Sequence, residues 1–417
     1  DKHQSCPYCG FTAPKIKEYV TKEITHSALT TQKCIIKYRA RRYKCSCCGK
    51  TYYEFNPFVF KSQKISILTV HNILKDLKDF NETFTSVARR YHVSPTSVST
   101  IFDKHVDIGR NPLPEIINFD EVYAFKSEKS KYVCVLLDFK KQIPVDVLPN
   151  RKKEYLLNYF QKIPLEERKK VKYACSDMYE VYRDVVHKVF PSCCMLLDYF
   201  HLSQDFHRKM NEVRIKVMKG YKDNKASDEY YLLKKFNWLL FKNPEDEDKH
   251  GRLFDVERER KYNSHFKSYM NYYDLRKKLL EINNDLTICY SLKLELVDFY
   301  SKSTIDNAKV NLENLIRSCI DTNIDEMIAF SNNLINWKQE IINSFTIVGT
   351  EYKVEADKGQ VVVCNKKVNN AIIENRNKII KCIKNNANGY TNWSRFRNRV
   401  MYVLDPNATF SLEPREK

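Results

Sequence analysis

The spacing of apolar and polar residues changes several times along the chain, and each change predicts a different kind of element. In "CIIKYRARRYKC", residues 34–45, the two kinds of residue alternate, which is the period of a β-strand with one basic face. From about Lys64, "KISILTVHNILKDLKDF" repeats its apolar residues every three to four positions and predicts an amphipathic helix. The first 110 residues are therefore expected to hold a β-ribbon followed by helices.

A second helical pattern follows in "TFTSVARRYHVSPTSVSTIFDKH", residues 83–105, with a short turn at residues 92–93. Ser94 can cap the next helix and Pro95 suits its first position, so this helix is predicted from Pro95 to about His105. Two short helices joined by a tight turn are typical of a helix-turn-helix, whose second helix enters the DNA major groove. Any short helical hairpin shares this periodicity, so that alternative stays open.

After a linker marked by Pro112 and Pro114, apolar runs alternate with helical patterns. The runs predict strands near residues 116–125, 131–138 and 142–148, and a helix follows from about 152 to 162. Then "VKYACSD" and "CCMLLD" predict two further strands, each followed by an amphipathic helix. Three strands that lead into strand–helix alternation predict a mixed α/β sheet.

The rest of the chain is expected to be mostly helical. From about Leu202 to Phe345 the pattern is that of long amphipathic helices, with the charged run "NPEDEDKHGR" as a loop. "YKVEADKGQVVVC" predicts a hairpin that turns between Asp357 and Gly359. A last helix, "NNAIIENRNKIIKCIKNNANGY", is predicted to stop at Gly389.

Two cysteine pairs share one motif. "CPYCG" and "CSCCG" are both Cys-x-x-Cys followed by Gly, and glycine permits the tight turn that presents paired thiolates. Matching the two glycines selects as ligands Cys6, Cys9, Cys45 and Cys48. Cys47 and Cys34 are then spare. The motif predicts one structural Zn²⁺, because four thiolates leave no open coordination position; the alternative is a set of reduced core cysteines.

Composition narrows the class of partner. The chain carries 71 Lys and Arg against 52 Asp and Glu, a formal net charge of +19, which gives a positive surface suited to nucleic acid. No stretch approaches eighteen consecutive apolar residues and the opening "DKHQSC" is polar, so neither a membrane span nor a signal peptide is expected. Most cysteines lie scattered in apolar segments, which favours reduced thiols in the cytoplasm over disulfides.

Two adjacent carboxylates, Asp120 and Glu121, interrupt the apolar run "EIINFDEVYAF". On a strand they point to opposite faces, so only one of them can face a given site. Asp177 ends the strand of "VKYACSD", where α/β folds bind ligands, and Glu374 lies on the last predicted helix. Three carboxylates brought together repel one another, and two divalent metal ions resolve this repulsion while activating water for phosphodiester attack. Other carboxylates also end strands, among them Asp138 and Asp198.

Four stretches make the chain resemble the bacterial DDE transposases of the ISL-three insertion-sequence family, nearly from end to end. They are "FDEVYAFKSEKSKYVCVLLDFKKQIPVDVLPNR", "CSDMYEVYRDVVHKVFP", "LLDYFH" and "IENRNKIIKCIKNNANGYTNWSRFRNR". The resemblance implies a ribonuclease-H-like core with a catalytic triad of Asp120, Asp177 and Glu374 and two Mg²⁺ or Mn²⁺ ions per active site. Related transposases carry an Asp/Cys-x-x-His motif after the second Asp, which implies an auxiliary role for Asp198 and His201. Alternatively, Asp198 only caps the following helix.

The expected fold is multidomain α+β: a zinc ribbon, a helix-turn-helix, and a ribonuclease-H-like α/β catalytic core interrupted by a long all-helical insertion. The expected boundaries are 1–55 for the ribbon, 56–110 for the helix-turn-helix, 113–201 for the first part of the core, 202–365 for the mainly helical insertion, and 366–417 for the final catalytic helix and C-terminal segment.

These features predict an insertion-sequence transposase, a cytoplasmic bacterial protein that binds the terminal inverted repeats of its element and target DNA. A homodimer or higher homo-oligomer is expected on DNA. The expected contacts are Arg41, Arg42, Arg89, Arg90 and Lys104 on phosphates, and Thr96, Ser97 and Thr100 on base edges. The alternative from another class is a DNA-binding regulator with an inactive catalytic core. The presence of all three acidic residues favours the enzyme.

Overall fold

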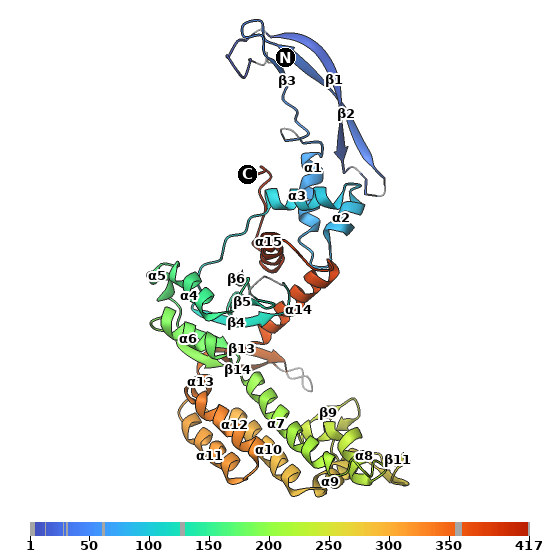
Figure 1. Cartoon of the computed structure of the whole chain (residues 1–417), viewed down its shortest axis with the longest axis vertical. Coiled ribbons are helices and arrows are strands. Elements are labelled where there is room, and N and C mark those ends of the chain that lie inside the picture. The colour runs from blue at the N-terminus through green and yellow to red at the C-terminus, as the bar shows by residue number, and fades with distance from the viewer. Residues whose placement is uncertain are drawn as a thin grey trace. The chain divides into compact units, whose positions relative to one another are not determined.

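The structure is a computed structural model that describes residues 5–12, 14–27, 29–30, 32–60, 63–125, 130–354 and 361–415. It has the expected mixed α+β composition (Figure 1). The chain divides into two compact units. The first comprises Asp1–Pro114, Asp120–Tyr159 and Ala371–Lys417, and the second comprises Glu115–Phe119 and Phe160–Asn370. In the described part of the chain, no helix is both long enough and apolar enough to cross a bilayer.

A long β-ribbon opens the first unit. Strand β1 (Lys15–His26) pairs antiparallel with β2 (Cys34–Lys44), and β3 (Thr51–Tyr53) adds to the other edge of β2. The predicted strand is confirmed, and its alternation leaves Lys37 and Arg39 exposed on one face.

Three helices follow in the first unit. They are α1 (Ile67–Asp76), α2 (Phe84–Arg90) and α3 (Pro95–His105). The predicted start of α3 is confirmed, because the Ser94 side chain accepts a hydrogen bond from the backbone of Ser97 and Pro95 occupies the first helical position. The apolar faces of α1, α2 and α3 meet in one core that contains Val70, Val87, Val98 and Phe102.

The C-terminal segment completes this core. Helix α15 (Trp393–Leu404) contributes Tyr402, which is 2% exposed and donates its hydroxyl hydrogen to the carbonyl of Leu74 at 3.0 Å. The buried guanidinium of Arg399 donates to the carbonyls of Asp79 and Glu82 between α1 and α2. The helices near residue 100 therefore depend on residues some 300 positions later in the chain.

A five-stranded sheet has the strand order β6-β5-β4-β7-β8, and the division between the units crosses its central strand. The strands are β4 (Ile116–Val122), β5 (Val133–Asp138), β6 (Pro144–Leu148), β7 (Tyr173–Ser176) and β8 (Cys194–Leu197). Strands β5 and β6 are antiparallel, whereas β4, β7 and β8 run parallel. All five predicted strands are present. The predicted helix after β6 is α4 (Lys153–Gln161).

The second unit is mostly helical. Its described helices are α5 (Leu165–Arg168), α6 (Glu180–Val189), α7 (Tyr199–Lys219), α8 (Asp228–Lys235), α9 (Tyr272–Glu281), α10 (Asn284–Lys302), α11 (Ala308–Asp321), α12 (Asp325–Asn336) and α13 (Lys338–Asn343), with a 3₁₀ helix η1 (Asn237–Phe241). Helices α7 to α12 bury one continuous apolar core, as Figure 1 shows in green to orange. The prediction of long amphipathic helices between residues 202 and 345 is confirmed.

The prediction of an all-helical insertion is wrong. Two short hairpins interrupt the helices: β9 (Glu247–Asp248) with β10 (Gly251–Arg252), and β11 (Lys261–Asn263) with β12 (Ser268–Met270). The first lies in the charged run expected to be a loop, where the Asp248 carboxylate accepts a hydrogen bond from the backbone of His250. Such an Asx turn gives the backbone a local alternative to helical hydrogen bonds.

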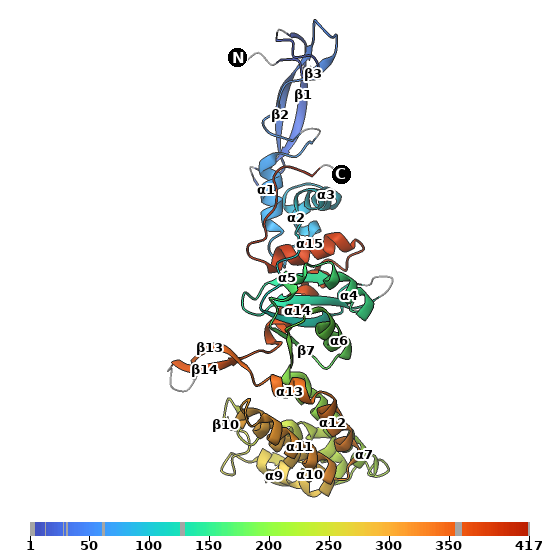
Figure 2. The same ribbon diagram turned by 90° about the vertical axis from the view of Figure 1, so that its left-hand side faces the viewer.

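A longer hairpin precedes the last two helices. Strand β13 (Ile347–Val354) pairs antiparallel with β14 (Val361–Lys367), and Figure 2 shows the hairpin extending away from α13. The predicted hairpin is confirmed, while its predicted turn between Asp357 and Gly359 lies outside the described residues. The last predicted helix is α14 (Ala371–Asn386), after which the backbone of Gly389 donates to the carbonyl of Lys384 at 2.9 Å.

Candidate active site and metal centres

The four predicted zinc ligands lie together. The sulfur atoms of Cys6, Cys9, Cys45 and Cys48 are all within 4.8 Å of one another. The Sγ–Sγ distance is 3.7 Å between Cys6 and Cys48 and 3.5 Å between Cys9 and Cys45. Four sulfur atoms at about 2.3 Å from one tetrahedral Zn²⁺ would be about 3.8 Å apart, so the thiol cluster fits this metal.

The two Cys-x-x-Cys turns have the same backbone geometry. Gly10 and Gly49 have φ of 74° and 68°, and each donates its backbone N–H to the carbonyl of the first cysteine in its motif. This left-handed conformation is the reason for glycine after each pair. The backbone N–H of Cys48 leads the contacts that lower the pKa of the Cys45 thiol to about 7, which favours the metal-binding thiolate. Cys47 is exposed.

Asp120 is buried near the end of β4 and is held by a residue of α14. It is 8% exposed; its Oδ1 accepts from the backbone of Glu121 at 2.8 Å, and its Oδ2 accepts from Nδ2 of Asn377 at 2.7 Å. Asn377 lies on α14, three residues after Glu374. The first unit thus brings the Asp120 strand and the Glu374 helix into direct contact.

The amphipathic pattern of α14 explains this contact. Ile373 and Ile380 are fully buried against Val133 and Val135 of β5, and Asn377 lies between them on the same helical face. Glu374 is half-buried in the first turn of the helix.

Glu121 has a different partner from its neighbour. It forms an ion pair with Arg151, whose guanidinium also lies 4.6 Å from the ring centroid of Tyr132. The two adjacent carboxylates of the sequence therefore have separate surroundings, as their opposite strand faces predict.

In the second unit, the predicted auxiliary residues contact each other. Asp198 immediately precedes α7, but its side chain makes no capping hydrogen bond to that helix. Instead, its Oδ2 lies 2.8 Å from Nδ1 of His201 and its Oδ1 accepts from the backbone of Asn370 at 3.2 Å. The alternative prediction, that Asp198 only caps the following helix, is therefore wrong. Asp177 follows the last residue of β7 and is half-buried.

Two fully buried asparagines, Asn118 and Asn370, lie beside these residues, and none of the sequence motifs pointed to them. Asn118 on β4 is fully buried and donates its Nδ2 hydrogens to Oδ1 of Asn370 at 2.7 Å and to the carbonyl of Asn369 at 2.8 Å. The one sequence signal for Asn118 is that it is an amide within the otherwise apolar stretch "IINF".

The predicted base-contacting residues border a groove in the first unit with a volume of about 480 Å³. Thr96, Ser97, Thr100 and Lys104 of α3 form one wall, and residues 63–65 lie in the other. The backbone of Thr25 accepts from Ser66 and donates to Lys64, which ties the ribbon to this wall.

The other residues predicted to contact DNA differ in whether they already pair with carboxylates of the protein. Arg89 is exposed, whereas Arg90 pairs with both Asp76 and Glu82. On the ribbon, Arg42 lies 2.7 Å from Glu18 and Arg41 lies 3.8 Å from Glu54.

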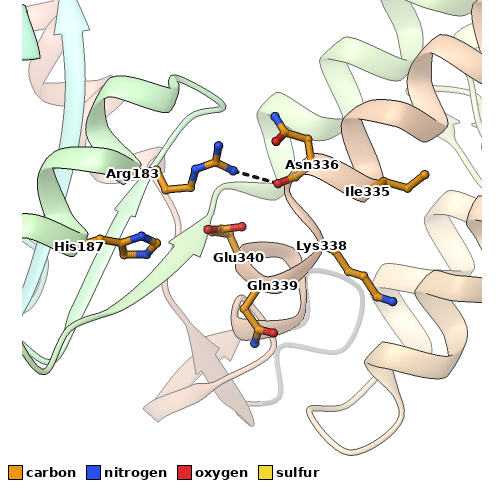
Figure 3. Close-up of a pocket in the computed structure, with 7 residues that line it drawn as sticks. All are labelled: Arg183, His187, Ile335, Asn336, Lys338, Gln339 and Glu340. Atoms are coloured by element: carbon orange, nitrogen blue, oxygen red, sulfur yellow. Dashed lines mark hydrogen bonds between the residues drawn. The ribbon is translucent and has the colours of Figure 1, made fainter.

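A separate pocket of about 400 Å³ lies in the second unit, and none of the predicted site residues lines it (Figure 3). Arg183 of α6 donates there to the carbonyl of Asn336 at 2.9 Å and lies 4.3 Å from the ring centroid of Trp337. Glu340 also lines this pocket and is 6% exposed.

A sequence model of a transposase family, the ISL-three DDE transposases, matches residues 117–356, more than half of the chain. The chain belongs to this family. The matched range contains Asp120, Asp177, Asp198 and His201 and ends before Glu374. The family resemblance of the sequence motifs is thereby confirmed.

One curated relative extends the similarity over nearly the whole chain. The transposase for insertion sequence element IS1001 of Bordetella parapertussis is 19% identical over 405 residues, which cover 97% of this chain and 89% of that protein. At this coverage the similarity reaches residues on both sides of the family match at 117–356, the α1–α3 helices among them.

Proposed function

We propose that this member of the transposase family binds the ends of its insertion sequence and catalyses metal-dependent DNA strand cleavage and strand transfer. One geometric observation carries the proposal. The buried carboxylate of Asp120 is held in place by Asn377, one helical turn after Glu374, so two of the three family carboxylates come from elements in direct contact.

Asp120, Asp177 and Glu374 are proposed to hold two Mg²⁺ or Mn²⁺ ions, since carboxylate oxygens are the donors these cations prefer. Asp120 lies near the carboxyl end of β4 and Asp177 directly follows β7, and the carboxyl ends of strands are where open α/β sheets bind ligands. Held by these carboxylates, divalent cations would supply Lewis-acid activation of water or the 3′-hydroxyl and charge stabilisation of the departing 3′-oxygen.

The side chains of this chain have two tasks in that reaction. Asp120 is already oriented by hydrogen bonds to both of its oxygens, so little reorganisation is needed when a cation binds. In the second unit, the carboxylate of Asp198 can only accept, so the proton of His201 lies on Nδ1 and Nε2 is left able to accept a proton or a hydrogen bond. His201 is proposed as an auxiliary group on this basis.

Recognition of the DNA ends is proposed to lie in the ribbon and the α1–α3 helices, which form a helix-turn-helix. Thr96, Ser97 and Thr100 line the groove beside α3 and can reach base edges, while Lys104 and Arg89 suit phosphates. The zinc at the four cysteines is structural. The helical region between residues 202 and 345 is proposed to hold DNA or a second copy of the chain.

The decisive experiment uses the full-length protein and DNA that carries the ends of its own element. Asp120→Ala, Asp177→Ala and Glu374→Ala should each abolish cleavage and strand transfer while end binding in a mobility-shift assay stays nearly unchanged. Glu121→Gln is the matched control, because it removes the adjacent carboxylate on the opposite strand face and should leave cleavage intact.

Two outcomes would contradict the proposal in different ways. If Glu374→Ala stays fully active while Asp120→Ala is inactive, another carboxylate completes the triad. If the unmodified protein binds ends but never cuts them with Mg²⁺ or Mn²⁺ present, the chain is a DNA-binding regulator on a transposase scaffold.

A further inference from the structure

Asn377 is a polar residue on an otherwise apolar helical face. It is 5% exposed, and its neighbours on that face of α14, Ile373 and Ile380, are fully buried in the core beneath β5. An amide buried in such surroundings costs roughly 1–3 kcal/mol for each polar group left without a partner, so its hydrogen bonds must be accounted for atom by atom.

The carboxylate of Asp120 fixes which way the amide points. An ionised carboxylate has no hydrogen to donate, so only the NH₂ group of Asn377 can form the 2.7 Å contact with Oδ2 of Asp120. The carbonyl oxygen, Oδ1, is therefore the amide atom that takes no part in this contact. This assignment of the two amide atoms follows from hydrogen-bonding capacity alone.

That oxygen is buried and has no hydrogen-bond donor among the described residues. The same is true of Oδ1 of Asn118, which lies two residues before Asp120 on the same face of β4 and whose NH₂ group is fully used by Asn369 and Asn370. Buried acceptors without a donor are rare in native proteins, and an ordered water or ion beside the acceptor is one of the recognised explanations. One of these two acceptors therefore belongs to Asn118, two residues before Asp120 in the sequence, and the other belongs to Asn377, the hydrogen-bond partner of Asp120.

We propose that Asn377 is a positioning residue of the divalent-metal site: its NH₂ group orients the Asp120 carboxylate, and its Oδ1 serves the cation or one of the waters that the cation retains. Amide oxygens and water suit Mg²⁺ and Mn²⁺, and Mg²⁺ keeps several waters when bound to protein. The inference rests on the proposed function, because it requires Asp120 to be a metal ligand.

The test measures Mn²⁺ affinity by electron paramagnetic resonance on the zinc-loaded, full-length protein without DNA. Asn377→Leu keeps the approximate volume of the side chain but removes both amide functions, and it should weaken Mn²⁺ binding about 10- to 100-fold, the usual effect of losing an outer-shell partner. Asn375→Leu is the matched control, since Asn375 is an exposed residue of the same type on the same helix. It should bind Mn²⁺ like the unmodified protein.

Asn377→Asp separates metal binding from folding. It returns an oxygen acceptor but places a second carboxylate beside Asp120, so Mn²⁺ should raise its melting temperature more than that of the unmodified protein. If Asn377→Leu does not fold, this larger Mn²⁺-dependent shift carries the test, and an unchanged shift overturns the inference.

Asp120→Asn separates the inference from the proposed function. If it binds Mn²⁺ as tightly as the unmodified protein, the proposed metal site itself is wrong. If Asp120→Asn loses binding while Asn377→Leu folds and retains full affinity, only the role of Asn377 is overturned. In that case, the asparagine is a structural link between helix and strand.

Discussion

Adjacent arginines on α2 have opposite surroundings. Arg90 is held between Asp76 and Glu82, whose side chains are 24% and 19% exposed, and the hydroxyl of Tyr91 also donates to Asp76. Arg89 is exposed and has none of these bonds. Both were expected to contact DNA phosphates, but the geometry supports a phosphate contact for Arg89 and a stabilising role for Arg90.

This difference can be tested with two alanine variants of the full-length protein. Arg89→Ala should weaken DNA binding. It should also reduce the slope of log affinity against log salt concentration by about 1, as expected for one lost phosphate contact. Arg90→Ala should leave the salt dependence nearly unchanged and destabilise α1–α3 by roughly 1–2 kcal/mol, because two half-buried carboxylates lose their cation. Hydrogen exchange of α1–α3 and a salt titration measure the two effects, and equal salt slopes for both variants would falsify the assignment.

At the scale of elements, the ribbon has little apolar core of its own. The buried residues around the cysteine cluster are only Cys6, Cys45 and Tyr52, with Tyr43 packed beside them, among the residues described. A metal ion is therefore expected to contribute much of the stability at this end of the ribbon, as in other small metal-dependent modules.

The protein purified without added metal should contain one zinc per chain. Cys48→Ser removes a thiolate from the cluster and should leave substoichiometric zinc, whereas Cys47→Ser changes an exposed residue of the same type next to it and should keep a full complement. Elemental analysis of the three proteins measures this. If Cys47→Ser loses zinc while Cys48→Ser retains it, the assignment of Cys48 as the fourth ligand is wrong.

At the scale of the whole molecule, the α1–α3 helices and the C-terminal segment fold as one structure in the first unit. Besides the buried Tyr402, the backbone of Ser411 donates to the carbonyl of His105, and the carbonyl of Ser411 lies 2.7 Å from Nδ1 of the same histidine. Lys78 also donates to the carbonyl of Asp405 at 2.8 Å. A fragment of residues 1–110 lacks all of these contacts.

DNA binding should therefore depend on a residue that is remote in sequence from α3. Tyr402→Ala creates a cavity in the α1–α3 core and removes the hydrogen bond to Leu74, a change that typically costs about 3–5 kcal/mol. We expect faster hydrogen exchange in α1–α3 and weaker binding to element ends. Tyr352→Ala, at a tyrosine that is 74% exposed on β13, is the control and should change neither.

A fragment of residues 1–110 should likewise bind ends less tightly than the full chain. If Tyr402→Ala exchanges and binds like the unmodified protein, the C-terminal segment is not part of the recognition fold. Recognition would then belong to the amino-terminal residues alone.

Interactions between near neighbours in the sequence determined most of the secondary structure of this protein. Ser94 and Pro95 mark the start of α3, glycine follows each cysteine pair because the turn needs positive φ, and alternation or helical spacing marks the five sheet strands and the long helices. These signals are readable because each depends on a residue and its near neighbours in the chain.

Only the tertiary structure decided which distant groups meet. The hydrogen bond between Asp120 and Asn377, the pairing of Arg90 with two acids, and the burial of Tyr402 against α1 depend on the packing of separate elements. The short hairpins at residues 247–252 and 261–270 were also missed, because each is only two or three residues per strand and turns on a local side-chain bond, Asp248 to the backbone of His250 and Asn263 to the backbone of His265. Residue spacing within one segment carries no information on contacts that join segments hundreds of residues apart, since those depend on the burial of apolar faces across the whole fold.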